Sequence, residues 1–450
     1  MEQKKLPLYT KVFYGMGDFA SNYVITFIAF FIMIYLTDSV GLNSAIVGTL
    51  MFAAKFVDGI SDVIFGALID RTHTKWGKAK PWMFVSTFPL CLFLVLEFMI
   101  PNTKPVLQYA YFFVVYTLIN SIFYTANNIA YATLSALITK NQQERVQLGT
   151  IRFIFAFSAM LCLSMTTTGL VEKFGGGVSG WRTVAVIYAI FALIVNTISC
   201  VAVKELPEDT DDEKGDTKKK ASLKETFSSL VHNKYFLMIL VLFVAMYIST
   251  SIISGAGVYY ATYVLGNPGM FGIFSMAVNV PMIVSLFFVP VVVKKLGIYK
   301  TNLYGGILTV LAALVTVYAG FTKNIPVMFV GLVLRSVFNS SLMGTVYTWI
   351  ADVAGYSWRK DGIHIEGSVF SCASVGNKVG SGLGSAVIGW LLAAGGYVAA
   401  SAAQPQSAVT MITIIYTVVP TICFMIIGIC CFNMKVEKAN KEWDEKHANN

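Results

Sequence analysis

Long runs of hydrophobic residues alternate with short polar segments along the whole chain. A membrane-spanning helix needs about 20 mostly apolar residues, and twelve runs approach or exceed that length. They cover residues 12–37, 45–69, 81–100, 106–136, 148–171, 183–203, 235–263, 270–293, 300–321, 325–351, 366–395 and 408–433. The pattern predicts an all-α integral membrane protein with twelve transmembrane helices.

The longest interruption of this pattern lies between the sixth and seventh runs. It is rich in charged residues and poor in aromatic ones, as expected of a solvated segment. We therefore predict an N-terminal six-helix half at 1–203, a cytoplasmic central loop at 204–234, a C-terminal six-helix half at 235–434 and a cytoplasmic tail at 435–450. Two such halves match the major facilitator fold, whose halves are related by an axis along the membrane normal.

Positively charged residues are distributed unequally between the loops. With the N-terminus inside the cell, the outer loops keep only Lys104, Lys173, Arg182 and Lys323. The inner loops carry many more, among them Arg71, Lys75, Lys78 and Lys80. Because cytoplasmic loops are enriched in Lys and Arg, we expect a multi-pass protein of the inner cell membrane with both termini in the cytoplasm.

The composition supports a surface that faces lipid. Hydrophobic residues make up 56% of the chain and charged residues 13%, whereas a soluble domain has about 25% charged residues. The net charge of +9 comes largely from the basic inner loops, so it indicates topology and no nucleic-acid partner is expected. The expected partners are the lipid bilayer and small solutes.

The second apolar run contains three charged residues on one helical face. Lys55, Asp58 and Asp62 follow one another at spacings of three and four residues. Two carboxylates inside a bilayer need a cation between or beside them. We predict a site for a coupling cation, Na⁺ or H⁺, with Asp58 and Asp62 as the metal ligands if the cation is Na⁺, and with Ser61 and Thr125 completing the oxygen shell. The alternative is a static Lys–Asp pair.

Five further charged residues lie within or at the ends of predicted helices. Arg152, Arg335 and Lys378 are deep, where charge is costly and usually functional. Asp18 and Glu97 lie nearer the helix ends, so a location at the membrane interface is the alternative for these two.

Polar side chains also gather in the fourth run, between Asn120 and Tyr131, with Tyr124, Thr125 and Asn128 between them. Amides and hydroxyls beside aromatic rings suit the binding of a sugar, although hydrogen bonding between helices explains part of the pattern. Tyrosines at 259–263 are interpreted mainly as an interfacial belt. Glycines at 376, 380 and 384 favour close helix packing.

Sequence signals of catalysis are missing. The chain contains no HExxH, GxSxG or GxxxxGK sequence, and its four histidines (His73, His232, His364 and His447) fall in predicted loops or tails. We expect neither an enzyme nor a bound cofactor apart from the coupling ion.

Several motifs resemble those of one transporter family. They are Tyr14-Gly-Met-Gly-Asp18, Val57-Asp-Gly-Ile-Ser-Asp62, Trp76-Gly-Lys-Ala-Lys-Pro-Trp82 and Tyr259-Tyr-Ala-Thr-Tyr-Val-Leu-Gly266. Taken in order over nearly the whole chain, they resemble the glycoside–pentoside–hexuronide:cation symporters, of which melibiose permease is the best-known member. The resemblance implies cation-coupled sugar symport by alternating access.

The resemblance also implies roles for individual residues. Asp58 and Asp62 would hold the cation with Ser61 and Thr125, and Lys378 with Ser374 would face that site from the eleventh helix. The full set of expected substrate-binding residues is Asp18, Asn22, Tyr124, Asn128, Arg152, Arg335, Ser374 and Lys378.

Departures from the melibiose permease pattern change the expected substrate. Asn22 and Asn128 stand where that relative carries sugar-binding carboxylates, and Ala132 stands where it carries a tryptophan. Arg335 adds a positive charge. We therefore hypothesise an acidic sugar, such as a hexuronide, paired with Arg152 or Arg335. The alternative function is a facilitator-fold carrier for a non-sugar solute such as a lysolipid.

Overall fold

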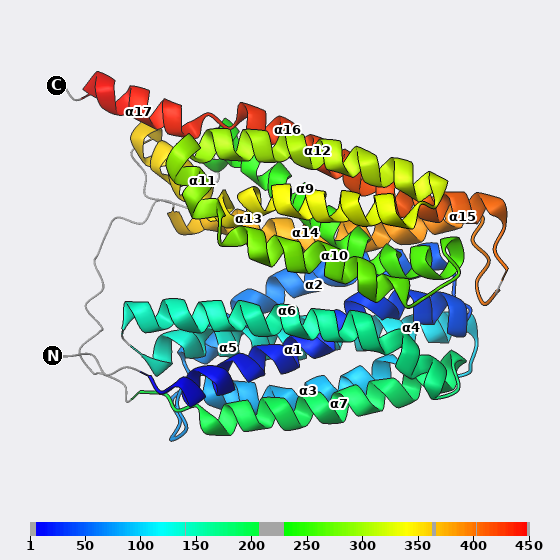
Figure 1. Cartoon of the computed structure of the whole chain (residues 1–450). Coiled ribbons are helices and arrows are strands. Elements are labelled where there is room, and N and C mark those ends of the chain that lie inside the picture. Colours follow the sequence, from blue (N-terminus) through cyan, green and yellow to red (C-terminus); the bar gives the residue numbers. More distant parts are fainter. Residues whose placement is uncertain (1–5, 140, 207–228, 362–365, 402, 448–450) are drawn as a thin grey trace. The chain divides into compact units, whose positions relative to one another are not determined.

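The structure is a computed structural model that describes residues 6–139, 141–206, 229–361, 366–401 and 403–447 (Figure 1). All regular secondary structure in these ranges is helical, apart from an isolated bridge between Thr74 and Gly77. This confirms the predicted all-α class.

The first half contains six long helical stretches. They are α1 (Leu8–Ile34) continued by the π-helix η1 (Tyr35–Ser39), α2 (Ser44–Asp70), α3 (Lys80–Glu97), α4 (Pro105–Thr117) continued by η2 (Leu118–Tyr124) and α5 (Thr125–Ile138), α6 (Gln142–Lys173), and α7 (Gly177–Ala202). At 1.5 Å per residue, about 20 residues are enough to cross the hydrocarbon layer.

The second half contains six more stretches and a terminal polar helix. They are α9 (Lys234–Tyr259) with η3 (Tyr260–Val264), the pair α10 (Met270–Leu286) and α11 (Val289–Leu296), α12 (Ile298–Thr322), α13 (Ile325–Asp361), α14 (Glu366–Ala394), and α15 (Gln406–Thr413) with η4 (Ile414–Val418) and α16 (Val419–Asn433). The polar helix is α17 (Val436–His447). The break between α10 and α11 bends the chain by 54°.

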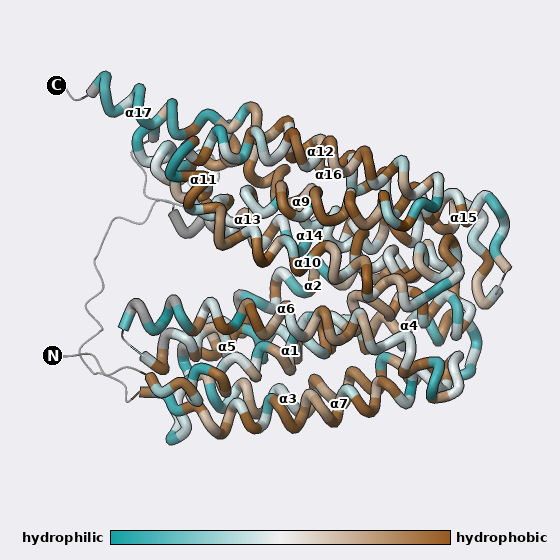
Figure 2. Tube along the Cα trace, in the orientation of Figure 1, coloured by the Kyte–Doolittle hydropathy of each residue, from teal (hydrophilic) through white to brown (hydrophobic). Residues whose placement is uncertain are grey.

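Nine helices among the described residues are long and apolar enough to cross a membrane, or ten if the bent pair α10–α11 counts as one. Helices α2 and α14, with 27 and 29 residues, are also long enough. This is compatible with the twelve predicted spans, and the chain is a multi-pass membrane protein. Figure 2 shows apolar residues along most of each long helix, while α17 is hydrophilic.

The chain forms two compact units that differ slightly from the two predicted halves. Unit 1 contains the first half together with Ala261–Ile273 and Ala386–Ala408, and unit 2 contains the rest of the second half. Most of the predicted central loop, residues 207–228, lies outside the described residues. In the predicted tail, α17 packs on α13, where Arg359 donates two hydrogen bonds of 2.8 Å to Asp444.

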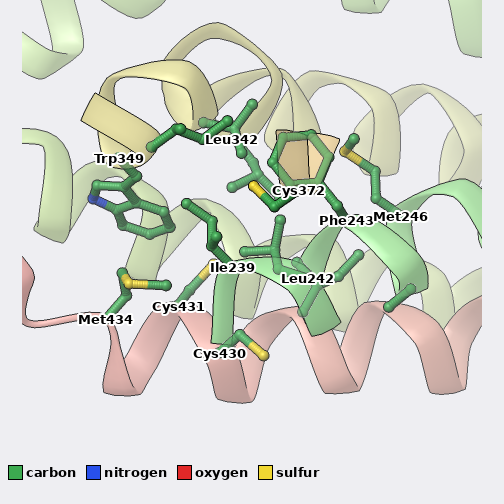
Figure 3. Close-up of a cluster of buried hydrophobic side chains, with 14 of the residues drawn as sticks. Ile239, Leu242, Phe243, Met246, Leu342, Trp349, Cys372, Cys430, Cys431 and Met434 are labelled. Atoms are coloured by element: carbon green, nitrogen blue, oxygen red, sulfur yellow. The ribbon is translucent and has the colours of Figure 1, made fainter. Parts of the chain in front are cut away.

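Helices within each unit pack through small and apolar side chains. Figure 3 shows such a cluster in unit 2, where Phe243 of α9, Trp349 of α13 and Cys372 of α14 share one core. The glycine face of α14 lies directly on α9, since a Cβ at Gly376 would stand 2.5 Å from the Cβ of Phe243. Six of the seven cysteines are buried.

Candidate functional site

The charged face of α2 meets the junction of η2 and α5 inside unit 1. Thr125 Oγ1 donates a hydrogen bond of 3.1 Å to Asp58 Oδ1. On the other carboxylate oxygen, Asp58 Oδ2, Lys55 Nζ approaches to 3.5 Å. The two residues that sequence analysis assigned to the same cation site are therefore in contact, and a lysine stands beside them.

Local backbone structure explains how Thr125 reaches Asp58. The π-helix η2 interrupts the α-helical run directly before Thr125, and π-helical turns are frequent at functional sites. The hydroxyl of Thr125 also lies 3.1 Å from the carbonyl oxygen of Asn120, and Ser121 Oγ bonds to the carbonyl of Ala54 on α2 at 3.4 Å. The Thr125 hydroxyl is thus the oxygen of the η2–α5 junction that contacts the Asp58 carboxylate, while Ser121 joins the same two segments through the backbone.

Ser61 and Asp62 are arranged differently. The Ser61 hydroxyl is buried and donates to the main-chain oxygen of Asp58 at 2.9 Å, so its hydrogen bond stays within its own helix. Asp62 is half-buried one turn beyond Asp58. The described residues include no group of three or more His, Cys, Asp or Glu side chains that could hold a metal ion, so a Na⁺ site here would draw on two carboxylates with hydroxyl and carbonyl oxygens.

A second polar cluster in unit 1 centres on Arg152 of α6. Arg152 Nε donates to Asp18 Oδ1 of α1 at 3.1 Å, and Nη2 donates to Asn128 Oδ1 of α5 at 3.1 Å. Asn22 donates to the main-chain oxygen of Asp18 at 2.9 Å. Four of the predicted substrate-binding residues therefore lie in one cluster.

Two stacked tyrosines form one wall of this cluster. The rings of Tyr14 and Tyr131 are 4.5 Å apart and nearly parallel, and the guanidinium carbon of Arg152 lies 5.2 Å from the Tyr131 ring centre. Aromatic rings beside polar groups suit a sugar, whose C–H faces need flat apolar surface. The sequence placed Tyr131 in the polar part of its helix but gave no reason to select it or Tyr14 as site residues.

Tyr124 connects the two clusters. Its ring is half-buried, and its phenol lies within electrostatic range of Asp18 and Arg152 as well as of Asp58 and Asp62. A solute bound at Arg152 and a cation bound at Asp58 would therefore have a common neighbour.

Asn127 of α5 has a structural role. Its amide donates to Met83 O and Ser86 Oγ on α3, both at 3.0 Å, and its oxygen accepts from Ser21 of α1 at 2.7 Å. The side chain is fully buried. Hydrogen bonding between helices thus accounts for one of the polar residues of the fourth run.

Asp18 and Glu97 are both buried in protein. Their exposed fractions are 2% and 0%. Asp18 is paired with Arg152, whereas neither carboxylate oxygen of Glu97 has a hydrogen-bond partner among the described residues. Both carboxyl groups lie inside the helix bundle of unit 1.

The remaining candidates belong to unit 2. Arg335 is 3% exposed, its guanidinium lies 5.5 Å from the ring centre of Phe424, and its Nη2 has no hydrogen-bond partner in the described part of the chain. On α14, Ser374 is exposed and Lys378 is half-buried. Because a helix turns by about 100° per residue, both side chains point away from the glycine face that packs on α9.

The interfacial-belt interpretation is wrong for the three tyrosines at 259–263. Tyr259 and Tyr260 are at most 1% exposed. Tyr263 Oη donates to Asp38 Oδ2 at 2.6 Å, and Tyr397 donates to the other oxygen of the same carboxylate. This Asp38 cluster was missed because its members come from three distant parts of the sequence.

The Trp76–Trp82 motif is held by a residue just after α7. The carboxylate of Glu205 accepts hydrogen bonds from the backbone N–H groups of Lys78, Ala79 and Lys80 at 2.7–3.1 Å. A side chain at Gly77 would collide with this carboxylate, and the φ angle of Gly77 is +111°. Since the N-terminus of a helix attracts anions, Glu205 fixes the start of α3.

Comparison with known proteins is consistent with this geometry. The family described as MFS/sugar transport protein matches residues 13–438, which is nearly the whole chain. The chain belongs to this family. Family membership confirms the major facilitator assignment and identifies the chain as a transporter and not an enzyme.

Individual curated proteins are similar to this chain over most of their length. An isoprimeverose transporter of Lactiplantibacillus pentosus is 29% identical over 100% of this chain and 94% of its own. The inner membrane symporter YicJ of Escherichia coli is 27% identical over 95% and 92%. A glucuronide carrier protein homolog of Escherichia coli is 26% identical over 88% and 86%.

Solved structures of transporters share the fold. The nucleoside transporter NupG has a TM-score of 0.68 at 14% identity, over 95% of this chain and 99% of that one. A D-xylose–proton symporter has a TM-score of 0.62 at 13% identity, over 93% and 97%. At these identities the likeness concerns the fold alone.

Proposed function

We propose that this protein is a symporter that couples the uptake of a sugar or glycoside to the entry of Na⁺ or H⁺ by alternating access. The observation that carries the proposal is the presence, in one compact unit, of a carboxylate cluster on α2 and a hydrogen-bonding cluster around Arg152, with Tyr124 near both. The names of similar proteins, which include an isoprimeverose transporter and a putative glycoside/cation symporter, support it.

The α2 cluster suggests how a cation and a solute are coupled. A carboxylate with a hydroxyl on one oxygen and an ammonium near the other can exchange that ammonium for an incoming cation. Because linkage is reciprocal, a cation that orders this region raises the affinity for the solute, and the solute raises the affinity for the cation.

Neutralising the second acid tests the coupling. In proteoliposomes with an inwardly directed Na⁺ or H⁺ gradient, Asp62→Asn should abolish accumulation of labelled glycoside, because one cation ligand is lost. Exchange of labelled for unlabelled glycoside, which needs no gradient, should persist at a measurable rate. Accumulation by Asp62→Asn as strong as that of the parent protein would exclude the assigned coupling role.

The same assay distinguishes Na⁺ from H⁺. The Thr125 hydroxyl on Asp58, with the carbonyl oxygen of Asn120 at 3.1 Å from that hydroxyl, favours Na⁺, which binds through several oxygen atoms. We expect an imposed Na⁺ gradient to drive accumulation at constant pH. Accumulation driven by a pH gradient in Na⁺-free buffer would assign the coupling to H⁺.

The acidic-sugar hypothesis now depends mainly on Arg335. Arg152 is already paired with Asp18, so it offers no free positive charge. Arg335 has an unpartnered Nη2 but lies enclosed in unit 2 beside Phe424. If uptake of glucosides and glucuronides changes equally in Arg335→Gln, this residue does not select for acid.

The rival is a carrier for a lysolipid. The amide and hydroxyl groups around Arg152 favour a polar solute, since a lipid tail needs an apolar path. Failure of every glycoside to accumulate under either gradient, together with uptake of a labelled lysolipid, would favour the rival.

We further propose that both termini face the cytoplasm. The excess of Lys and Arg in the loops on that side supports this orientation. A fluorescent protein fused after the C-terminus should fluoresce, and an alkaline phosphatase fused at the same point should remain inactive. The opposite pair of results would reverse the orientation.

A further inference from the structure

The Asp18–Arg152 pair has an unequal geometry. The carboxylate side chain of Asp18 is 3% exposed, whereas the side chain of Arg152 is 30% exposed. A single contact joins them, from Nε to Oδ1, and Nη2 turns to Asn128 instead. Part of Arg152 is therefore accessible to a solute, while the Asp18 carboxylate is almost fully buried.

The surrounding groups leave this arginine fully compensated. From α1 it faces Asp18 and lies near the phenol of Tyr14, from α5 it faces Asn128 and Tyr131, and from η2 it lies near Tyr124. Asp18 and Arg152 are the two groups of this set that carry a full charge, and their charges cancel. On α2, Lys55 lies 3.5 Å from Asp58, and Asp62 follows one turn after Asp58, so that neighbouring cluster adds no net positive charge.

We infer that Asp18 determines the substrate charge that this site accepts: by pairing with Arg152 from inside the bundle, it makes the site select neutral glycosides and reject uronides. The inference rests on the proposed glycoside transport and makes it more specific. Asp18 acts on the substrate through Arg152, so it is a positioning residue.

Electrostatics gives the reason. A uronide carboxylate that approached Arg152 would lose its hydration and would meet a guanidinium whose charge is already balanced at 3.1 Å. A neutral hydroxyl needs no counter-charge and can accept a hydrogen bond from the exposed part of the guanidinium. The site therefore favours hydroxyl groups over a carboxylate.

The variant Asp18→Asn separates the effect of the side-chain charge from the effect of its shape. In Asp18→Asn the amide oxygen can still accept from Arg152 Nε, but the negative charge is gone. Arg152 then becomes an uncompensated and partly exposed guanidinium, which pairs well with carboxylates.

The test uses matched nitrophenyl glycosides that differ only at C6, a glucoside with its glucuronide and a galactoside with its galacturonide. Uptake of each, and its inhibition of the others, is measured in proteoliposomes for the parent protein and for Asp18→Asn. We expect the parent to prefer the neutral member of a pair, and Asp18→Asn to shift the preference toward the uronide by at least about tenfold. The double variant Asp18→Asn with Arg152→Gln should lose this shift.

Glu144→Gln is the matched control. Glu144 of α6 also pairs with a base of α1, Lys11, at 2.7 Å, and this pair lies near the start of both helices, about two helical turns before Asp18 and Arg152. Glu144→Gln removes one buried carboxylate charge between the same two helices but leaves the Asp18–Arg152 pair intact. It should therefore leave the uronide-to-glucoside ratio unchanged. A shift in this control as large as in Asp18→Asn would overturn the inference.

The outcomes separate the inference from the proposed function. If the parent transports neither the neutral nor the uronic glycosides, the proposed function fails and the inference fails with it. If the parent transports glucuronide at least as well as glucoside, the inference alone fails, and this result does not depend on the folding of any variant. A folded Asp18→Asn protein with an unchanged ratio also overturns the inference.

Discussion

Asn127 and Asn128 are neighbours in α5, and a helix that turns by about 100° per residue directs them to different surroundings. Asn127 is enclosed by side chains of α1, α3 and α7, including Ser21, Ser86 and Asn196. Asn128 is half-buried and accepts from Arg152. The first residue connects helices, and the second belongs to the candidate site.

This difference predicts that substitutions at these two neighbouring positions affect different properties. Asn127→Ala removes a buried amide that hydrogen-bonds to α1 and α3, at a cost of about 1–3 kcal/mol, so the midpoint of thermal unfolding in detergent should fall. Asn128→Ala should leave the midpoint nearly unchanged and weaken glycoside uptake. A larger loss of stability in Asn128→Ala would contradict the assignment.

Thr125 provides a residue-scale test of the cation site. Thr125→Val keeps the shape of the side chain but removes the hydroxyl beside Asp58. Loss of one oxygen ligand should raise the cation concentration for half-maximal uptake about tenfold. In Ser121→Ala, which removes a hydroxyl bonded to the carbonyl of Ala54, this concentration should stay within about twofold. Equal shifts in both variants would exclude a ligand role for Thr125.

Sequence reasoning identified individual residues better than their partners. Charge in an apolar helix was enough to select Asp58 and Arg152, because such residues are costly unless they function. Their contacts join positions that are 67 and 134 residues apart, and no periodicity within one helix can specify such a pairing. The burial of Asp18 depended on this missing information.

Among the elements, the π-helices are the feature that the apolar pattern could not predict. Four π-helical segments occur in the described chain, η1 to η4, and three of them hold Asp38, Asn120 and Tyr263. A π-turn adds one residue to a turn and rotates all later side chains relative to the preceding ones. The hydropathy of these segments is that of any apolar helix, so only the structure reveals the rotation.

The glycine face of α14 was predicted correctly as a packing surface. A Cβ at Gly380 would lie 2.6 Å from the carbonyl oxygen of Val244 on α9. A backbone atom cannot move aside as the end of a flexible side chain can, so the helices would have to separate.

Replacement of this glycine tests the packing. Gly380→Ala should lower the thermal midpoint in detergent and reduce the yield of folded protein, because α9 and α14 can no longer approach. Gly169→Ala is the control, since a Cβ at Gly169 in α6 meets no atom within 4 Å. Similar behaviour of the two variants would show that close contact at Gly380 is unimportant.

At the scale of the whole molecule, the apolar pattern predicted the fold class and the motifs indicated the family, but the chain division drawn from the sequence differs from the division by contacts. Division at the charged linker yields two equal halves, whereas unit 1 also contains Ala261–Ile273 and Ala386–Ala408. The Asp38 cluster explains part of this difference, because Tyr263 and Tyr397 come from these two segments. A division by sequence alone cannot anticipate contacts of single side chains.

The balanced charge of the Asp18–Arg152 pair also has a bioenergetic consequence. If the site selects a neutral glycoside and one cation accompanies it, each cycle carries one positive charge into the cell. A membrane potential of 100 mV then contributes about 2.3 kcal/mol, enough for about 50-fold accumulation without any chemical gradient of the cation. An anionic substrate would cancel that charge and forfeit this contribution. Addition of a neutral glycoside to protein on a solid-supported membrane should therefore evoke an electrical current, whereas an electrically silent response would mean that the solute brings in a compensating negative charge.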